Sequence, residues 1–179
     1  MTLSEAKELL IENNIKFELL EFRNEAEYLQ HSILFPYIKK TRPNKVIAIV
    51  IKSKNGNKNI ELQFNEVDGV YKFEEMRFGE FCYEMFNYNE EMLVGDLIHN
   101  ITEIKKGTLI VIVLNDIKHQ RWLADACFDL SDDDDEFGKI GFQKAMSKIN
   151  KPKSFLSKLK KSKLQYEIFD WNSYRCIVK

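Results

Sequence analysis

Two apolar runs constrain the fold of this chain most strongly: VIAIVI at 46–51 and LIVIVL at 109–114. Each run has six residues, whereas a membrane-spanning helix needs about 20. A short run that is apolar on both faces is typical of a β-strand covered on both sides of its sheet. The sequence therefore predicts a fully buried central strand at 108–115 and another strand at 45–53.

Further β-prone segments flank these runs and are separated by turn signals. Asn55-Gly56 and Asp68-Gly69 are dipeptides that favour tight turns between antiparallel strands. Gly79 interrupts another apolar segment and predicts a bulge or bend. The remaining expected strands are 15–22, 59–64, 70–76, 80–86, 122–130, 164–171 and 174–179.

Helices are expected where apolar residues recur every three or four positions behind a capping residue. Thr2 with Glu5, and Asn24 with Glu27, match capping-box spacing, which predicts helices at 3–13 and 24–34. Residues 90–106 and the segment from 137 to about 150 follow, and a short C-terminal helix is expected around 155–159. The prediction is a single α+β domain over 1–179 with a mixed or mainly antiparallel sheet. It has about three main helices plus the short C-terminal one, and 137–179 forms a C-terminal elaboration.

Composition narrows the class of protein. The chain has 179 residues, a length typical of one domain that folds around its own core. Its three cysteines are widely spaced, which argues against a disulfide framework or a zinc site. The N-terminus lacks the basic and apolar regions of a signal peptide. We expect a cytoplasmic bacterial protein that needs no cofactor and has no membrane segment; its oligomeric state is left open.

The net charge of −1 conceals a strong asymmetry along the chain. Residues 1–60 carry +3 and residues 137–179 carry +9, whereas residues 61–103 carry −9 and residues 104–136 carry −4. Acidic surfaces accelerate association with basic proteins. The middle of the chain is therefore the first place to look for a surface that binds a basic partner.

Nine lysines follow one another without an acid between residues 137 and 163. One interpretation is non-specific nucleic-acid binding through 139–163, with Lys158, Lys160, Lys161 and Lys163 as the contacts. The segment has no arginine for base recognition, and its aromatic residues occupy core-facing positions. We therefore favour amphipathic helices whose lysines lie on the solvated side, and nucleic acid is not the expected partner.

Five consecutive acids, Asp132 to Glu136, precede the lysines. An EF-hand calcium loop requires glycine at its sixth position and glutamate at its twelfth. Counting from Asp129, those positions are Asp134 and Ile140. The calcium motif is absent, and a solvated loop is the expectation.

Two expected strands share the pattern acid-x-Cys-aromatic-acid: EFCYE at 80–84 and DACFD at 125–129. Because side chains alternate between the faces of a strand, Glu80 and Glu84 share one face, as do Asp125 and Asp129. Period-two alternation would also place Arg121 on the face of Asp125. Glu80, Glu84, Arg121, Asp125 and Asp129 are therefore the predicted binding residues.

Two functions remain open for these acids. If the two strands are neighbours, four carboxylates converge and form a divalent-metal or acid/base enzyme site, because such a cluster requires a compensating cation. Alternatively, they belong to an acidic face that docks a positively charged protein. No Rossmann, P-loop or hydrolase-elbow motif is present. The favoured prediction is therefore a small protein-binding module, such as an acidic-faced inhibitor or immunity-type protein that neutralises a basic partner.

Overall fold

The computed structural model describes residues 1–32, 41–83, 90–130, 136–150 and 163–179. The helices of this part of the chain are α1 (Leu3–Glu12), α2 (Glu25–Ser32), α3 (Glu90–Lys106) and α4 (Glu136–Asn150). The strands are β1 (Glu18–Phe22), β2 (Val46–Ile51), β3 (Ile60–Val67), β4 (Val70–Phe78), β5 (Phe81–Tyr83), β6 (Leu109–Asp116), β7 (Arg121–Asp129), β8 (Leu164–Phe169) and β9 (Tyr174–Val178). None of these helices is long and apolar enough to cross a membrane.

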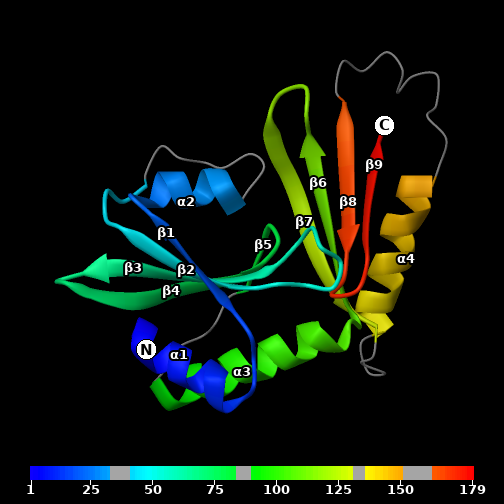
Figure 1. Cartoon of the computed structure of the whole chain (residues 1–179). Coiled ribbons are helices and arrows are strands. Elements are labelled where there is room, and N and C mark those ends of the chain that lie inside the picture. The colour runs from blue at the N-terminus through cyan, green and yellow to red at the C-terminus, as the bar shows by residue number, and fades with distance from the viewer. Residues whose placement is uncertain (33–40, 84–89, 131–135, 151–162) are drawn as a thin grey trace.

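The strands form two antiparallel sheets, so the predicted α+β class is confirmed. Sheet A has the order β1-β2-β3-β4-β5, and sheet B has the order β7-β6-β8-β9. Figure 1 shows the two sheets side by side, with α4 along the outer side of sheet B. Both apolar runs lie inside a sheet: β2 between β1 and β3, and β6 between β7 and β8.

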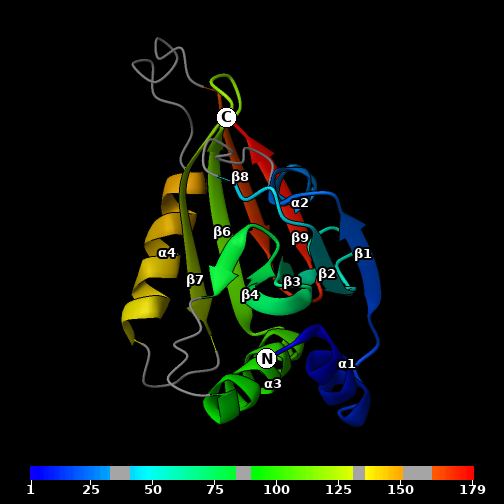
Figure 2. The same cartoon turned by 90° about the vertical axis from the view of Figure 1, so that its left-hand side faces the viewer.

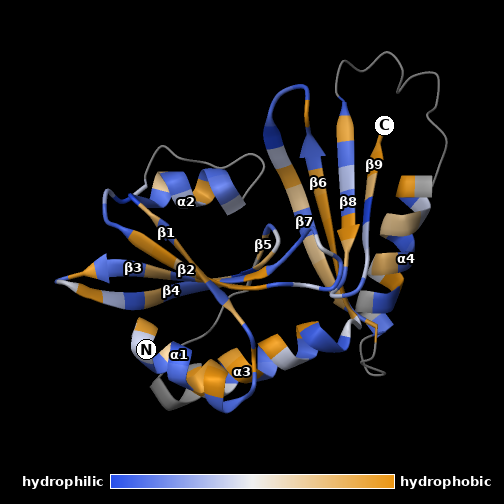
Figure 3. Ribbon diagram, viewed as in Figure 1, coloured by the Kyte–Doolittle hydropathy of each residue, from blue (hydrophilic) through white to orange (hydrophobic). Residues whose placement is uncertain are grey.

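One hydrophobic core joins the two sheets to the helices below them. It contains Leu10 of α1, Leu62 of β3, Ile101 of α3, Val113 of β6 and Phe169 of β8, all at most 1% exposed. Figures 1 and 2 show α1 and α3 packed under sheet A, with α3 extending toward sheet B. The orange segments of Figure 3 follow the strands and the sheet-facing side of α3. Because one core spans both sheets, the junction between them has a fixed geometry.

The outer faces are covered by the other two helices. On sheet A, α2 places Tyr28 against a small cluster formed by Val46, Ala48 and Val50. On sheet B, α4 packs against β7, where the rings of Phe128 and Phe142 meet edge to face at 5.9 Å. α4 therefore presents its apolar side to the sheet, as its amphipathic pattern predicts.

Several helix and strand boundaries expected from the sequence agree closely with those of the structure, and some differ. The helix at 90–106 is confirmed, whereas the short helix expected around 155–159 lies outside the described residues. The strand expected at 80–86 begins at Phe81, and Gly79 and Glu80 form the turn of the β4–β5 hairpin. Phe78 is fully buried and Phe81 packs against the core. Both phenylalanines therefore pack inward, on either side of the turn.

A β-bulge changes the faces of β7. Ala124 lies opposite Leu114 and Trp122 lies opposite Asn115, so Leu123 is an extra residue in β7. Arg121 lies opposite Asp116 and therefore on the other face from Asp125. The prediction that Arg121 shares a face with Asp125 is wrong, because simple alternation does not anticipate a bulge.

Candidate functional site

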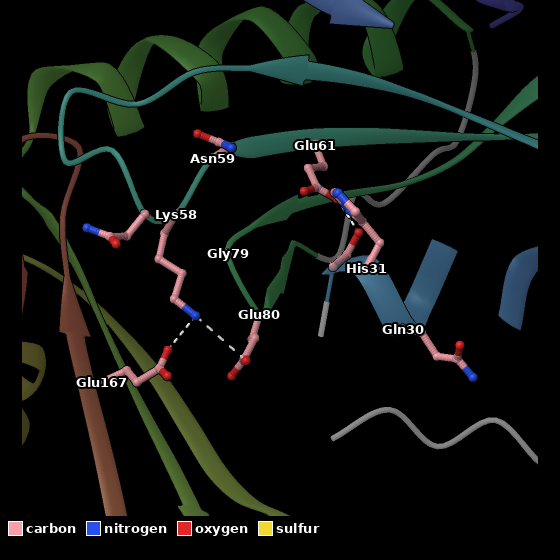
Figure 4. Close-up of a pocket in the computed structure, with 10 residues that line it drawn as sticks. Gln30, His31, Lys58, Asn59, Glu61, Gly79, Glu80 and Glu167 are labelled. Carbon is pink, nitrogen blue, oxygen red and sulfur yellow. Dashed lines mark hydrogen bonds and ion pairs between the residues drawn. The ribbon is translucent and has the colours of Figure 1, made fainter. Parts of the chain in front are cut away.

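A pocket of about 350 Å³ lies where the two sheets meet, and we call it the junction pocket (Figure 4). It opens to solvent, and polar side chains dominate its lining. Four elements contribute: the end of α2, the β2–β3 connection with the start of β3, the β4–β5 turn, and β8. The lining residues are Gln30, His31, Ser32, Asn57, Lys58, Asn59, Glu61, Gly79, Glu80 and Glu167.

Lys58 lies on the side of the pocket nearest sheet B. Its ammonium group pairs with Glu167 of β8 and lies 3.7 Å from Oε1 of Glu80 in the β4–β5 turn. The same Nζ lies 5.6 Å from the ring centroid of Phe169 and 5.9 Å from that of Tyr174. A cation held by carboxylates from both sheets, with aromatic rings beside it, links the sheets electrostatically.

The Asn55-Gly56 turn places Lys58 there. The Oδ1 atom of Asn55 accepts the backbone N–H groups of Asn57 and Lys58, each at 2.8 Å. The Nδ2 atom of Asn55 donates to the carbonyl oxygen of Asp170 at 2.5 Å. The backbone N–H of Asn55 donates to the carbonyl oxygen of Trp171 at 3.0 Å. The sequence signal for a hairpin is therefore also the anchor of the β2–β3 connection on sheet B.

The β4–β5 turn holds Glu80 against sheet B. Gly79 has φ +59°, and a Cβ atom there would lie 2.8 Å from Cζ of Phe169. Only glycine fits this conformation and this close approach. Asn115 of β6 donates from Nδ2 to Oε2 of Glu80 at 3.5 Å. Glu80 is 7% exposed, so its carboxylate lies between the two sheets.

A buried polar stripe on β3 begins at the opposite side of the pocket, which Glu61 lines. Glu61, Gln63 and Asn65 occupy alternate positions and are each at most 8% exposed, because they face α2. The hydroxyl of Ser32, in the last turn of α2, donates to Oε2 of Glu61 at 2.5 Å. Gln63 donates from Nε2 to Oδ1 of Asn65 at 2.8 Å. β4 continues the stripe, since Arg77 lies opposite Glu61 in the ladder.

Two tyrosines lie close to carboxylates of the pocket. Burial and then the charge of Glu61 raise the pKa of the Tyr28 phenol. Burial and then the charge of Glu167 raise the pKa of the Tyr174 phenol. Burial is the larger cause at both phenols, and the carboxylates act in the same direction.

The structure places the predicted binding residues in different surroundings. Glu80 lines the junction pocket, and Glu84 lies outside the described residues. Burial raises the pKa of the Asp125 carboxyl, although its own backbone N–H and the charge of Arg77 act in the opposite direction. Strand β5 packs against β7, so the two strands with the shared pattern are neighbours in different sheets.

The other two predicted residues lie toward the ends of β7. Asp129 lies opposite Leu109 at the α3 end of sheet B. Arg121 lies at the opposite end, where its Nη2 atom is 3.6 Å from Oδ2 of Asp116. The five predicted residues therefore do not form one described cluster.

No group of three or more histidine, cysteine, aspartate and glutamate side chains could hold a metal ion among the described residues. The predicted four-carboxylate metal site includes Glu84, so it is not described in full. The acids Asp132–Asp135 and the lysines Lys158, Lys160 and Lys161 also lie outside the described residues, whereas Lys163 is exposed just before β8.

Sequence reasoning missed three residues of the pocket: Lys58, Glu61 and Glu167. Glu61 and Glu167 sit in alternating strand patterns that resemble solvated faces. The neighbouring hairpin and strand patterns predict that these segments pair in a sheet. They do not predict which faces of that sheet become buried.

Comparison of the chain with protein-family models, with curated proteins and with solved structures gave no significant match. The function is therefore argued from the geometry and charge of the site.

Proposed function

We propose that this protein is a protein-binding module whose junction pocket receives a basic side chain of a partner protein. The single observation that carries the proposal is the charge of the pocket lining. Glu61, Glu80 and Glu167 contribute three carboxylates, and Lys58 is the lysine among the lining residues. An open pocket with more carboxylates than cations attracts an ammonium or guanidinium group.

Two further features support this proposal. The segment 61–103, which supplies β3, β4, β5 and α3, carries −9, so the part of the chain that contains Glu61 and Glu80 has the same sign as the pocket. Glu61 and Glu167 belong to strands and Glu80 to a tight turn, so the carboxylates are held rigidly before a partner arrives. A preorganised site loses less conformational entropy on binding than a flexible one. An inhibitor of a basic protein, including an immunity-type protein, would use such a surface.

A titration of a short arginine peptide into the whole protein tests the proposal. We expect Glu61→Gln to weaken binding about tenfold, because one charge-assisted hydrogen bond contributes about 1.5 kcal/mol. Glutamine can still accept the hydrogen bond from Ser32, so the fold should tolerate the change. Glu18→Gln is the matched control, since Glu18 pairs with Lys52 on the edge strand β1.

Capture of partners from a bacterial lysate extends the titration. The proposal expects basic proteins that are retained by the native chain and by Glu18→Gln, released by salt, and lost with Glu61→Gln. Equal binding by Glu61→Gln and the native chain, or capture of RNA or DNA alone, would overturn the proposal.

A further inference from the structure

One end of sheet B brings together segments that are distant in sequence. The turn between β6 and β7, the start of β8 and the end of β9 lie together at the top of Figure 1. The backbone N–H of Ile117 donates to the carbonyl oxygen of Lys163 at 2.9 Å. The backbone N–H of Lys179 donates to the carbonyl oxygen of Leu164 at 2.7 Å. We call this surface the hairpin end, and it consists of Lys118, His119, Arg121, Trp122, Lys163 and Lys179.

The hairpin end is basic. Four lysine and arginine residues and one histidine lie within 114–124, 163–166 and 176–179. The one acid in these segments is Asp116, which is 1% exposed and therefore does not reach the surface. The exposed charge at this end of the molecule is therefore positive, opposite in sign to the junction pocket.

Buried Asp116 holds the cations in place. Its Oδ2 atom lies 2.7 Å from Nδ1 of His119 and 3.6 Å from Nη2 of Arg121. Its Oδ1 atom accepts the backbone N–H of His119 at 3.3 Å, which closes the turn. The side chains of His119 and Arg121 nevertheless remain at least half exposed. They are positioned by the buried carboxylate and remain exposed to solvent.

An exposed indole accompanies the cations. Trp122 is 50% exposed, whereas Trp171 is 4% exposed in the core. Trp122 lies on the edge strand β7, next to Arg121 and opposite Asn115. Trp122 and Arg121 are adjacent residues of β7 and therefore point to opposite faces at the end of sheet B. An exposed aromatic ring close to cations is the combination that single-strand binding uses.

We propose that the hairpin end binds single-stranded nucleic acid, with Lys118, Arg121 and Lys163 on phosphates and Trp122 stacked on a base. Single-strand binding combines cations along the backbone with an aromatic platform that accepts any base. The lysine segment contains no arginine. The fold brings Arg121 and Trp122 to the same end of sheet B as Lys163, the last lysine of that segment, with β6 between them. The site lies away from the junction pocket, so this inference is independent of the proposed function.

Chemistry favours a nucleic acid over the other anionic partners. An anionic membrane surface favours several apolar side chains that insert together. The exposed large apolar residues described at this end are Trp122 and Leu123 on β7 and Val178 on β9, which lie on the two opposite edge strands of sheet B. An acidic protein would match the charge but would not use an exposed indole as a stacking surface. Both alternatives become outcomes of the test.

Fluorescence anisotropy with a labelled oligouridine of about 12 nucleotides tests the inference on the whole chain. We expect binding that weakens about tenfold or more between about 50 mM and about 200 mM salt, because three phosphate contacts release counterions. Binding should also quench the fluorescence of Trp122. Trp122→Phe should remove that quenching while the emission of Trp171 persists.

Variants locate the site. The double variant Lys118→Glu/Arg121→Glu should bind at least tenfold more weakly, and Trp122→Ala about 5- to 100-fold more weakly. Lys16→Glu/Lys105→Glu reverses the same number of charges elsewhere and should bind like the native chain. Lys105 belongs to the last turn of α3, which lies on the opposite side of the molecule from the β6–β7 hairpin (Figure 1). Circular dichroism confirms that each variant folds.

Four results would overturn the inference. They are absence of oligouridine binding, equal binding by Lys118→Glu/Arg121→Glu, loss of binding only when Lys158, Lys160 and Lys161 are reversed, and binding to anionic phosphatidylserine vesicles without binding to oligouridine. Equal weakening by Lys16→Glu/Lys105→Glu would show a general charge effect and would also contradict the proposed site.

Discussion

The junction pocket and the hairpin end have opposite charge: carboxylates outnumber cations in the pocket, and cations outnumber carboxylates at the hairpin end. In the pocket, Lys58 is the minority charge, and carboxylates from both sheets surround it. At the hairpin end, Asp116 is the minority charge, and it lies buried beneath His119 and Arg121. In both places the less frequent charge is paired with charges of the opposite sign. The more frequent charge is the one that we propose attracts a partner. Single variants can therefore separate a structural role from a binding role.

Lys58→Met should give the largest loss of stability. The change leaves Glu80 and Glu167 buried without their shared cation, which costs about 3–5 kcal/mol. The lysine side chain is 15% exposed and its two carboxylate partners are at most 5% exposed. Urea unfolding monitored by circular dichroism measures the free energy of unfolding.

Lys52→Met is the matched control for Lys58→Met. Lys52 also pairs with a glutamate, Glu18, but its side chain is 56% exposed. An exposed pair contributes about 0–1 kcal/mol. A loss in Lys58→Met that is no larger than the loss in Lys52→Met would refute the structural role of the minority charge.

Gly79→Ala should give the next largest loss, about 2–4 kcal/mol, again by urea unfolding. The new Cβ atom would meet Phe169 at 2.8 Å, and alanine is strained at φ +59°. Gly69→Ala has a similar conformational cost at φ +77° but meets nothing within 4 Å. The difference between the two variants measures how tightly the β4–β5 turn packs on sheet B. Equal losses would mean that the junction is loosely packed.

Much of the fold follows from the sequence because its signals are local. The Asn55-Gly56 turn, the capped helix at 3–12 and the run at 109–114 each carry their own pattern, and each element forms where that pattern lies. The division into two sheets is not local, since it depends on which strands meet across the core. Antiparallel pairing therefore follows from the sequence, whereas the division into two sheets does not.

The candidate site was harder to predict for the same reason. Glu61 and Glu167 alternate with apolar residues, and alternation normally indicates a solvated face. They are buried because α2 and the β4–β5 turn cover those faces, which is a consequence of tertiary packing. The pattern shared by 80–84 and 125–129 predicts Glu80 as a binding residue. Its actual neighbours depend on the β4–β5 turn, which brings Glu80 close to β8. Arg121 was misassigned because a bulge has no clear sequence signal.

At the hairpin end, Asp116→Asn should alter the pH dependence of stability. The hydrogen bond from His119 keeps the pKa of Asp116 below its ordinary value of 3.8 in the folded protein. A carboxyl with a depressed pKa stabilises the folded state above its unfolded pKa, and that contribution disappears as pH falls through the folded value. The difference in Tm between the native chain and Asp116→Asn should therefore narrow as pH falls below about 4. A difference that is constant or widens would contradict this role of Asp116.

Gln120→Gly should have the smallest effect and the opposite sign. Gln120 has φ 48° in the β6–β7 turn, a conformation in which a side chain is strained. Glycine should raise the free energy of unfolding by up to about 1 kcal/mol in urea unfolding. Oligouridine affinity should stay unchanged, since Gln120 is neither a phosphate contact nor a stacking residue in the proposed site. A destabilised variant would show that the turn depends on this side chain.

One nuclear magnetic resonance experiment on the ¹⁵N-labelled chain tests most directly whether the two oppositely charged surfaces bind different ligands. An arginine peptide and the oligouridine are titrated separately, and the shifted backbone amide signals are mapped for each ligand. The account predicts that the peptide shifts signals at Lys58, Glu61, Glu80 and Glu167, and that the oligouridine shifts signals at 117–123 and Lys163. Overlapping sets of shifted signals, or peptide shifts confined to residues outside the junction pocket, would contradict it.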